Sequence, residues 1–275
     1  MAIGRGIILI GRSSKAAVIV TSIVGFLLST AVIASVVSKN STAGTVTGQV
    51  AIHGVGPMLG GMVLFFDKVA GPPPISAKYW RVPTYAFKLD DNAGFQAELP
   101  AGTYYIGAIE NVSGDPVEPP REGEYYFISQ DSNGRPRTFT VKKNRTLSLG
   151  MTTAAKLFSK ALLEEKGITA IEGKIRNEKG EPVEGMMVFA FKKSGRTGKP
   201  LFVSDRSDKN GKYQLRVSGG GNYYLSTRRA NNKTEVKEEP EDVYQGDRMV
   251  TVKAAKVLEG IDITVPAPGV AQLHP

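Results

Sequence analysis

Two stretches of this chain, residues 91–106 and 208–225, follow the same plan. Each begins with Asp-x-x-Gly, continues as an alternating strand, turns at a second glycine and resumes with Tyr-Tyr and an aliphatic residue. Glycine supplies unusual backbone geometry, and aspartate and asparagine bond the local backbone, so each stretch predicts a β-hairpin rather than a phosphate or metal loop. An internal repeat constrains the architecture more than composition does.

The similarity extends to both sides in the same order. Residues 46–50 and 61–66 match 171–175 and 185–191, and residues 138–142 and 147–149 match 249–253 and 261–265. The copies differ where Gly94 directly precedes Phe95, since Gly211 is separated from its aromatic residue by one position. Each copy contains about seven short strands, several with every second residue apolar, which is typical of two packed antiparallel sheets.

The second copy, in residues 173–189, 208–213 and 221–224, resembles a carboxypeptidase regulatory-like domain, a transthyretin-like or collagen-adhesin B-type β-sandwich. The first copy resembles this family less closely because of its long insertions. The resemblance implies a non-catalytic accessory module of exported and surface proteins that binds partners or glycans. We therefore predict an all-β fold with two tandem seven-stranded antiparallel sandwiches, Ig-like or prealbumin-like, after an N-terminal transmembrane helix.

Residues 16–37 form an apolar run of 22 residues without a charge. A run of that length can cross a bilayer as a helix, and Arg5, Arg12 and Lys15 on one side keep residues 1–15 in the cytoplasm. This pattern predicts a membrane-anchored protein whose body is extracytoplasmic, in the periplasm or at the cell surface. A cleaved signal peptide is the alternative, because small-x-small sites follow, and the protein would then be secreted.

The predicted organisation has six parts. These are a cytoplasmic basic segment (1–15), the signal anchor or signal peptide (16–37), the first sandwich with insertions (45–150), a linker or short helix (151–169), the second sandwich (170–266) and a C-terminal tail (267–275). Within the linker, Leu157, Phe158, Ala161 and Leu162 would share one helical face. An unstructured connector is the alternative.

Composition argues against catalysis and against nucleic-acid binding. The chain has no cysteine and only two histidines, His53 and His274, so thiol, zinc and serine–histidine chemistry lack their usual groups. Oxygen ligands for calcium occur at residues 90–92 and 205–210, but Asp and Asn also favour turns for their own backbone bonding. The basic residues that give the chain its net charge of +9 are interspersed with acidic residues rather than clustered. We predict no enzyme activity, no catalytic or metal-binding residues, no cofactor and no nucleic-acid partner.

The first copy carries two aromatic insertions, residues 71–85 and 115–137. Long loops in compact domains are often functional, and tyrosine and tryptophan are enriched at recognition surfaces. The candidate binding residues for a protein or glycan are Tyr79, Trp80, Tyr85, Tyr125 and Tyr126. Filling of the sandwich core is the alternative for the aromatic side chains. The favoured function is a non-enzymatic structural or adaptor protein that binds envelope or surface proteins; the alternative is a pair of carbohydrate-binding modules with Trp80 as a stacking platform.

Overall fold

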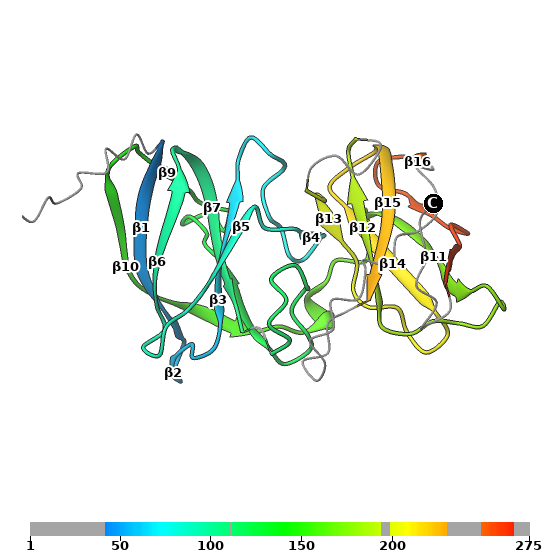
Figure 1. Cartoon of the computed structure of the whole chain (residues 1–275), viewed down its shortest axis with the longest axis horizontal. Coiled ribbons are helices and arrows are strands. Elements are labelled where there is room, and N and C mark those ends of the chain that lie inside the picture. The colour runs from blue at the N-terminus through cyan, green and yellow to red at the C-terminus, as the bar shows by residue number, and fades with distance from the viewer. Residues whose placement is uncertain (1–41, 111, 194–198, 230–248, 267–275) are drawn as a thin grey trace, which may run out of the picture. The chain divides into compact units, whose positions relative to one another are not determined.

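The computed structural model describes residues 42–110, 112–193, 199–229 and 249–266 (Figure 1). These residues form an all-β structure and belong to one compact unit. The predicted basic segment (1–15), transmembrane segment (16–37) and C-terminal tail (267–275) lie outside the described residues. Within the described ranges, no helix has the length and apolar character needed to span a bilayer.

The first half of the body, residues 42–157, contains strands that lie in two layers connected by the long strand β10. β6, β1 and the start of β10 form one layer, and β5, β3 and β7 form the other, where β8 and β9 also pair with β7. The strands are β1 (Ala43–Ile52), β2 (Gly56–Pro57), β3 (Met62–Asp67), β5 (Tyr85–Lys88), β6 (Gly94–Pro100), β7 (Gly102–Ile109), β8 (Tyr125–Ile128), β9 (Thr138–Val141) and β10 (Thr146–Leu157).

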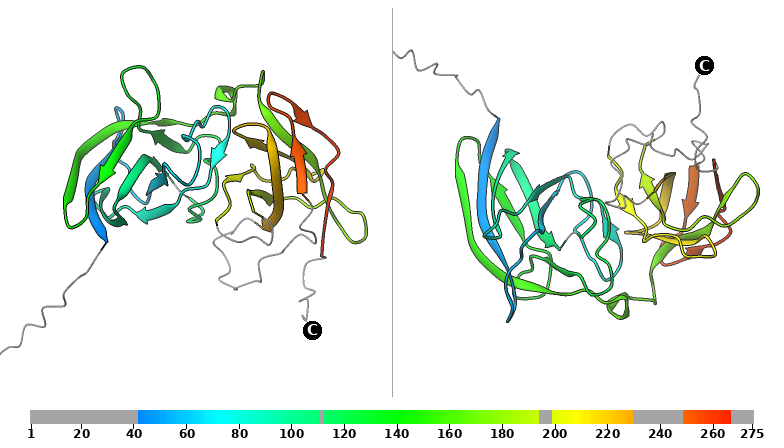
Figure 2. Two further views of the ribbon diagram at one scale, coloured as in Figure 1. Left: turned by 90° about the horizontal axis from the view of Figure 1, so that it is seen from above. Right: turned by 60° about the horizontal axis from the view of Figure 1, so that its bottom comes forward.

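The second half, residues 169–266, also consists of two sheets (Figure 2). β14, β11, β17 and β18 form one sheet, and β13, β12, β15 and β16 form the other. The strands are β11 (Thr169–Asn177), β12 (Met186–Phe191), β13 (Phe202–Val203), β14 (Lys212–Val217), β15 (Gly221–Arg229), β16 (Met249–Val252), β17 (Val257–Leu258) and β18 (Ile263–Val265).

Strand pairing follows one pattern in the two halves. β1 pairs antiparallel with β6 as β11 does with β14, and β3 pairs with β7 as β12 does with β15. The prediction of wholly antiparallel sheets is wrong in one respect, because β1 pairs parallel with β10, and β11 pairs parallel with β17 and β18. In each half the chain crosses to the second layer before it returns to the first. The returning strands, β10 in the first half and β17 and β18 in the second, therefore run in the same direction as β1 and β11.

An aspartate holds the equivalent turn in each half. The Oδ1 atom of Asp90 accepts hydrogen bonds from the backbone N–H groups two and four residues later (2.8 and 2.7 Å), and that of Asp208 does the same (2.9 and 2.8 Å). The third residue after each aspartate is left-handed, Ala93 with φ 57° and Gly211 with φ 74°. Asp208 therefore corresponds to Asp90, not to Asp91 as the sequence spacing predicted, and the apparent shortening of the first copy disappears.

Each half has its own apolar core between its two layers. The Tyr-Tyr pairs divide in the same way, since Tyr104 and Tyr223 enter these cores and donate their hydroxyl hydrogens to the carbonyl oxygens of Pro100 and Gly219 (2.8 Å each). The first core includes Val46, Val50, Val63, Phe65, Leu99 and Ile106. The second includes Ile171, Ile175, Val188, Leu215, Leu225 and Val250.

The segment between the two halves does not form the amphipathic helix that its sequence suggested. β10 continues to Leu157, where Lys156 and Leu157 pair antiparallel with Tyr126 and Tyr125 of β8. Only a short 3-10 helix follows, Lys160–Leu162. The hydrogen bonds to β8 hold the first residues of the predicted helix as a strand, because tertiary pairing outweighs local helix propensity.

Candidate binding site at the junction of the two halves

The first insertion leaves the first half and completes a sheet of the second. Its strand β4 (Trp80–Arg81) pairs antiparallel with β13, so that β4 is the edge strand of the β13–β12–β15–β16 sheet (Figure 1). Tyr79 belongs to the apolar core of the second half, with its ring centroid 5.2 Å from that of Phe202. The second core is therefore built in part from residues of the first insertion.

Arg81 is buried within the first insertion and holds it in place through hydrogen bonds to the backbone. It is 2% exposed, and its guanidinium donates hydrogen bonds to the carbonyl oxygens of Pro72 and Asp67. The guanidinium also lies over the ring of Phe66, 5.7 Å from the centroid. Burial lowers the pKa of Arg81 from its ordinary 12.5 to about 10. The side chain closes the loop between β3 and β4 and stays protonated at neutral pH.

A third apolar cluster joins the outer faces of the two halves. It combines the outward side chains of β3 with those of β12, and Trp80 and Tyr126 belong to it. The β3 residues are Met62, Leu64 and Phe66, and the β12 residues are Met187, Phe189 and Phe191. Because β3 and β12 hold the same place in the two halves, equivalent sheet faces pack together here.

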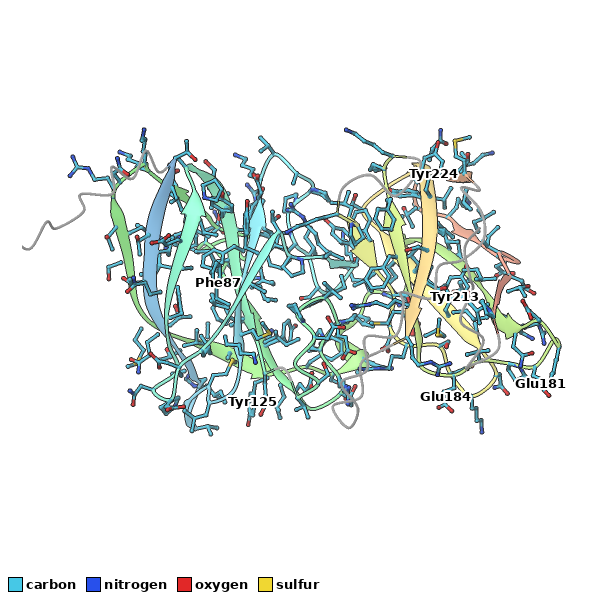
Figure 3. The ribbon with its side chains drawn as sticks, in the orientation of Figure 1. Phe87, Tyr125, Glu181, Glu184, Tyr213 and Tyr224 are labelled. Atoms are coloured by element: carbon cyan, nitrogen blue, oxygen red, sulfur yellow. The ribbon has the colours of Figure 1, made fainter. Side chains whose placement is uncertain are left out.

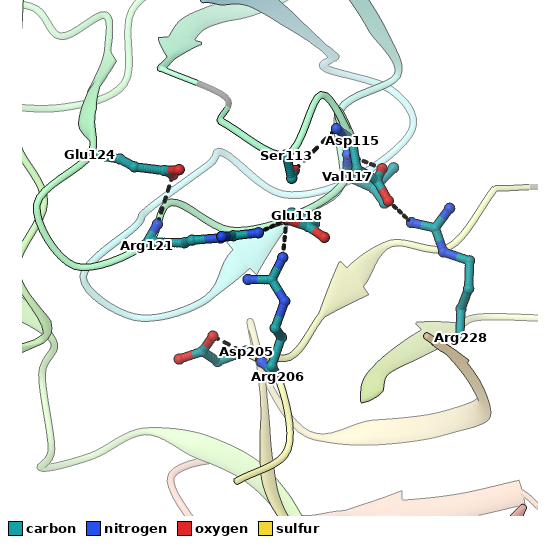
Figure 4. Close-up of polar contacts among 9 residues, drawn as sticks. All are labelled: Ser113, Asp115, Val117, Glu118, Arg121, Glu124, Asp205, Arg206 and Arg228. Carbon is teal, nitrogen blue, oxygen red and sulfur yellow. Dashed lines mark hydrogen bonds and ion pairs between the residues drawn. The ribbon is translucent and has the colours of Figure 1, made fainter. Parts of the chain in front are cut away.

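The second insertion contributes two buried ion pairs to the same junction (Figure 4). Asp115 pairs with Arg228 of β15 at 2.5 Å, and Glu118 pairs with Arg206. The two carboxylate side chains are only 3% and 4% exposed. Glu118 also lies 3.5 Å from the guanidinium of Arg121, which belongs to the second insertion, whereas Arg206 and Arg228 belong to the second half. Loss of Arg228 or Arg206 would remove the charge that the second half places beside a buried carboxylate, so these pairs are sensitive points of the junction.

A cavity of about 380 Å³ opens where these segments meet. Its wall includes Tyr79 and Trp80 from the first insertion, Pro119 and Pro120 from the second, and Phe158 and Leu163 from the connector. Residues after β13 and on β14, including Arg206 and Gln214, complete it. The volume falls within the range typical of small-molecule sites.

The five predicted binding residues do not form one surface patch. Tyr79, Trp80 and Tyr126 are buried, at 5%, 9% and 6% exposure, whereas Tyr85 and Tyr125 are half-buried. Of the five, the structure brings only Tyr79 and Trp80 together in the cavity wall. The exposure of Trp80 is that of a core residue rather than an open stacking platform. A binding role for the five residues stays a prediction.

The sticks in Figure 3 show Tyr125 on β8 in the first half and Tyr213 on β14 in the second. Tyr213 lines the cavity, although its place in the sequence indicates only the repeated hairpin. Pro119, Pro120 and Arg206 were also missed as site residues. The proline pair lies in the aromatic insertion and was a usable signal, whereas the sequence around Arg206 offered only the oxygen ligands of residues 205–210, which are also typical of turns.

The oxygen-rich turns hold no group of metal ligands in the described part of the chain. No cluster of three or more histidine, aspartate or glutamate side chains suitable for a metal ion occurs there. Asp90 and Asp208 use their Oδ1 atoms for backbone hydrogen bonds in their own turns. These two side chains therefore act as turn residues.

No protein-family model matches the chain, and no curated protein matches it. Among solved structures, the chain is similar to the minor pilin of Streptococcus agalactiae, with 12% identity, a TM-score of 0.24 and coverage of 83% of this chain and 99% of the pilin. The shaft pilin SpaA of Lactobacillus rhamnosus GG gives the same four values.

The TIE protein of Bacillus anthracis is 11% identical with a TM-score of 0.24, over 81% of this chain and 34% of that protein. The chain thus spans about a third of the Bacillus protein, and it spans 64% of a streptococcal ancillary pilin. TM-scores this low do not establish a fold shared with any of these proteins.

Proposed function

We propose that this protein is a non-enzymatic, membrane-tethered, extracytoplasmic structural or adaptor protein that binds envelope or surface proteins. The observation that carries the proposal is the way the two halves are joined, through a shared sheet, a shared apolar cluster and two buried ion pairs. An apolar interface of this kind removes the relative motion that separate domains usually have. A rigid two-part body can hold bound partners at a fixed spacing.

The proposal includes the prediction that the two halves are copies of one module of the carboxypeptidase regulatory-like type. Matching strand pairs, matching aspartate turns and matching tyrosine hydroxyl bonds support this idea. Such modules act by binding rather than by chemistry, which agrees with a chain whose conspicuous aromatic side chains pack against one another. Tyr85 and Tyr125 are half-buried and stay candidates for contact with a partner.

The tether is proposed from the apolar run 16–37 and the basic residues before it. Full-length protein should fractionate with membranes, and protease added from the outside should remove the body while residues 1–15 stay protected. Leu27→Arg places a charge in the apolar run and should release the protein from the membrane, because a charge at the bilayer centre costs about 3 kcal/mol. Ser41→Arg, which lies after the run, is the matched control.

Partner binding is tested by proximity labelling from the full-length protein in its own membrane. The same surface proteins should be labelled reproducibly by the wild type and lost when Tyr85 and Tyr125 are both changed to alanine. A soluble, shortened product would overturn the anchor, and labelling that does not exceed a membrane-tethered control protein would overturn the adaptor function.

A further inference from the structure

One hydrogen-bond donor in the wall of the junction cavity, and one acceptor on a residue next to that wall, have no partner within the chain. Trp80 lies in the cavity wall, and its Nε1–H is buried without a hydrogen-bond partner. Glu118 adjoins the cavity through Pro119 and through its ion-pair partner Arg206, and its Oε1 atom is also buried without a partner. Buried polar groups normally find partners, because an unpaired one costs about 1 to 3 kcal/mol.

Each of the four basic residues in the cavity lining already has a partner within the chain. Lys160 contacts Asp205 at 2.5 Å, and Arg206 pairs with Glu118. Lys212 lies 3.7 Å from Glu172. The fourth basic residue of the lining, Arg216, donates to the side-chain oxygen of Gln214 and to the carbonyl oxygen of Glu164. Since four basic residues face three acidic ones in this lining, the cavity has little net charge and favours a neutral ligand.

The remaining wall is apolar and aromatic, with Tyr79, Phe158, Leu163 and Val203 among its residues. A ligand that fits must therefore combine an apolar face with groups that both donate and accept hydrogen bonds. A sugar ring has this combination, because its C–H groups form apolar faces and each hydroxyl can accept from one partner and donate to another.

We propose that the junction cavity binds a neutral saccharide of one or two rings. A ring hydroxyl accepts a hydrogen bond from Trp80 Nε1–H, and a hydroxyl donates to Glu118 Oε1. The edge of the indole, not its face, makes the specific contact. Both insertions, the connector and β14 contribute to the wall, so a bound saccharide also fastens the first half to the second. This inference does not depend on the adaptor function, and either can fail without the other.

Trp80 is the only tryptophan of the chain, so its fluorescence reports on the cavity directly. Full-length protein is titrated with glucose, galactose, N-acetylglucosamine and cellobiose up to about 10 mM, which covers dissociation constants in the millimolar range. Sialic acid and a blocked tetraproline peptide serve as anionic and peptide comparisons. We expect a saturable change in Trp80 fluorescence with at least one neutral saccharide and none with the two comparison ligands.

Trp80→Phe keeps an aromatic ring but removes the Nε1–H donor, and it should weaken saccharide binding, measured by calorimetry, about threefold to tenfold. Tyr224→Phe removes a hydroxyl outside the cavity wall and should leave the affinity unchanged. If Trp80→Phe fails to fold, Leu163→Phe provides a second test, because it narrows the cavity from the connector and should also weaken binding. The proposal is overturned if no saccharide binds or if only the peptide binds. It is also overturned if the wild type and the variant that folds, Trp80→Phe or Leu163→Phe, bind the saccharide with equal affinity.

Discussion

At Gly173 the backbone of β11 comes too close to the segment before β18 to leave room for a side chain. A Cβ atom at this position would lie 2.0 Å from the carbonyl oxygen of Ile261, which is backbone and has little freedom to move. The adjacent strands β11 and β18 pair in parallel, and the N–H of Ile261 donates to the carbonyl oxygen of Glu172 at 2.9 Å. Any added methyl group must push this pairing apart.

Gly173→Ala should therefore lower the free energy of unfolding by about 3 kcal/mol, the upper range for overpacking of a well-packed site. Chemical denaturation of the purified protein measures the change. Gly219→Ala is the control, since no atom lies within 4 Å of a Cβ there and its φ is not in the left-handed region. Equal midpoints for the two variants would contradict the close approach at Gly173.

The free energy of unfolding is expected to fall at alkaline pH because of the buried hydroxyl of Tyr79. Burial raises the pKa of Tyr79 from 10 to about 12, and its hydroxyl donates to the carbonyl oxygen of Pro73 at 2.7 Å. The unfolded chain loses this proton near pH 10, whereas the folded protein keeps it to about pH 12. The wild type should therefore have a larger free energy of unfolding than Tyr79→Phe below pH 10. Between pH 10 and 12 this difference should fall by about 2 kcal/mol. Denaturant unfolding of both proteins at a series of pH values measures the difference in free energy of unfolding. A difference that stays constant from pH 8 to 12 would contradict the prediction.

Among the elements, the hairpins could be predicted from the sequence and the strand β4 could not. The aspartate turns and tyrosine pairs are local signals, because the residues that specify them lie within about 15 positions of one another. β4 consists of two residues and exists only because β13, more than a hundred residues later, offers a free edge. The buried state of Trp80 and Tyr79 follows from that long-range pairing, which is why the aromatic insertion suggested a surface site.

One signal for the junction was present in β3 and β12. Their sequences, MVLFFD and MMVFAF, do not alternate between apolar and polar residues, and nearly every residue is buried. Continuous apolar strands are typical of sheets covered on both faces. The inner faces of these two strands meet their own cores and the outer faces meet each other. Absence of alternation therefore indicated a second covered face, although not which segment covers it.

The attachment of β4 depends on Arg81. Arg81→Met should lower the free energy of unfolding by about 3 kcal/mol, because the carbonyl oxygens of Pro72 and Asp67 lose their buried, charge-assisted hydrogen bonds. Arg176→Met is the matched control, since that guanidinium donates to the carbonyl oxygen of Gly180 at an exposed turn. Thermal melting of both variants decides the matter: similar melting temperatures would mean that Arg81 does not hold the insertion.

At the scale of the whole body, the two halves should unfold together. Because of the apolar cluster that joins them and the shared sheet, each half is stabilised by its contacts with the other. Calorimetry of the wild type is expected to show one cooperative transition for the body, as small single domains do.

Met187→Asp should separate the two halves in this measurement. Met187 is fully buried in the joining cluster, and a charge placed there without a partner disfavours the packed state by several kcal/mol. We expect two transitions in place of one, with the core of the first half largely retained. Met151→Asp, at a position that is 62% exposed, should keep the single transition. One unchanged transition in Met187→Asp would show that the halves are not coupled through this cluster.

The placement of β4 also bears on the order in which the protein is made. Synthesis proceeds from the N-terminus, so Tyr79, Trp80 and Arg81 are produced well before the strand that they complete. A first half that has already folded would present β4 as a template for β13 when the later segment arrives. The second half made alone would instead expose the edge of β13 and lack Tyr79 in its core. Its folding is thus expected to follow that of the first half, and a chain truncated from the front should be the more prone to aggregate.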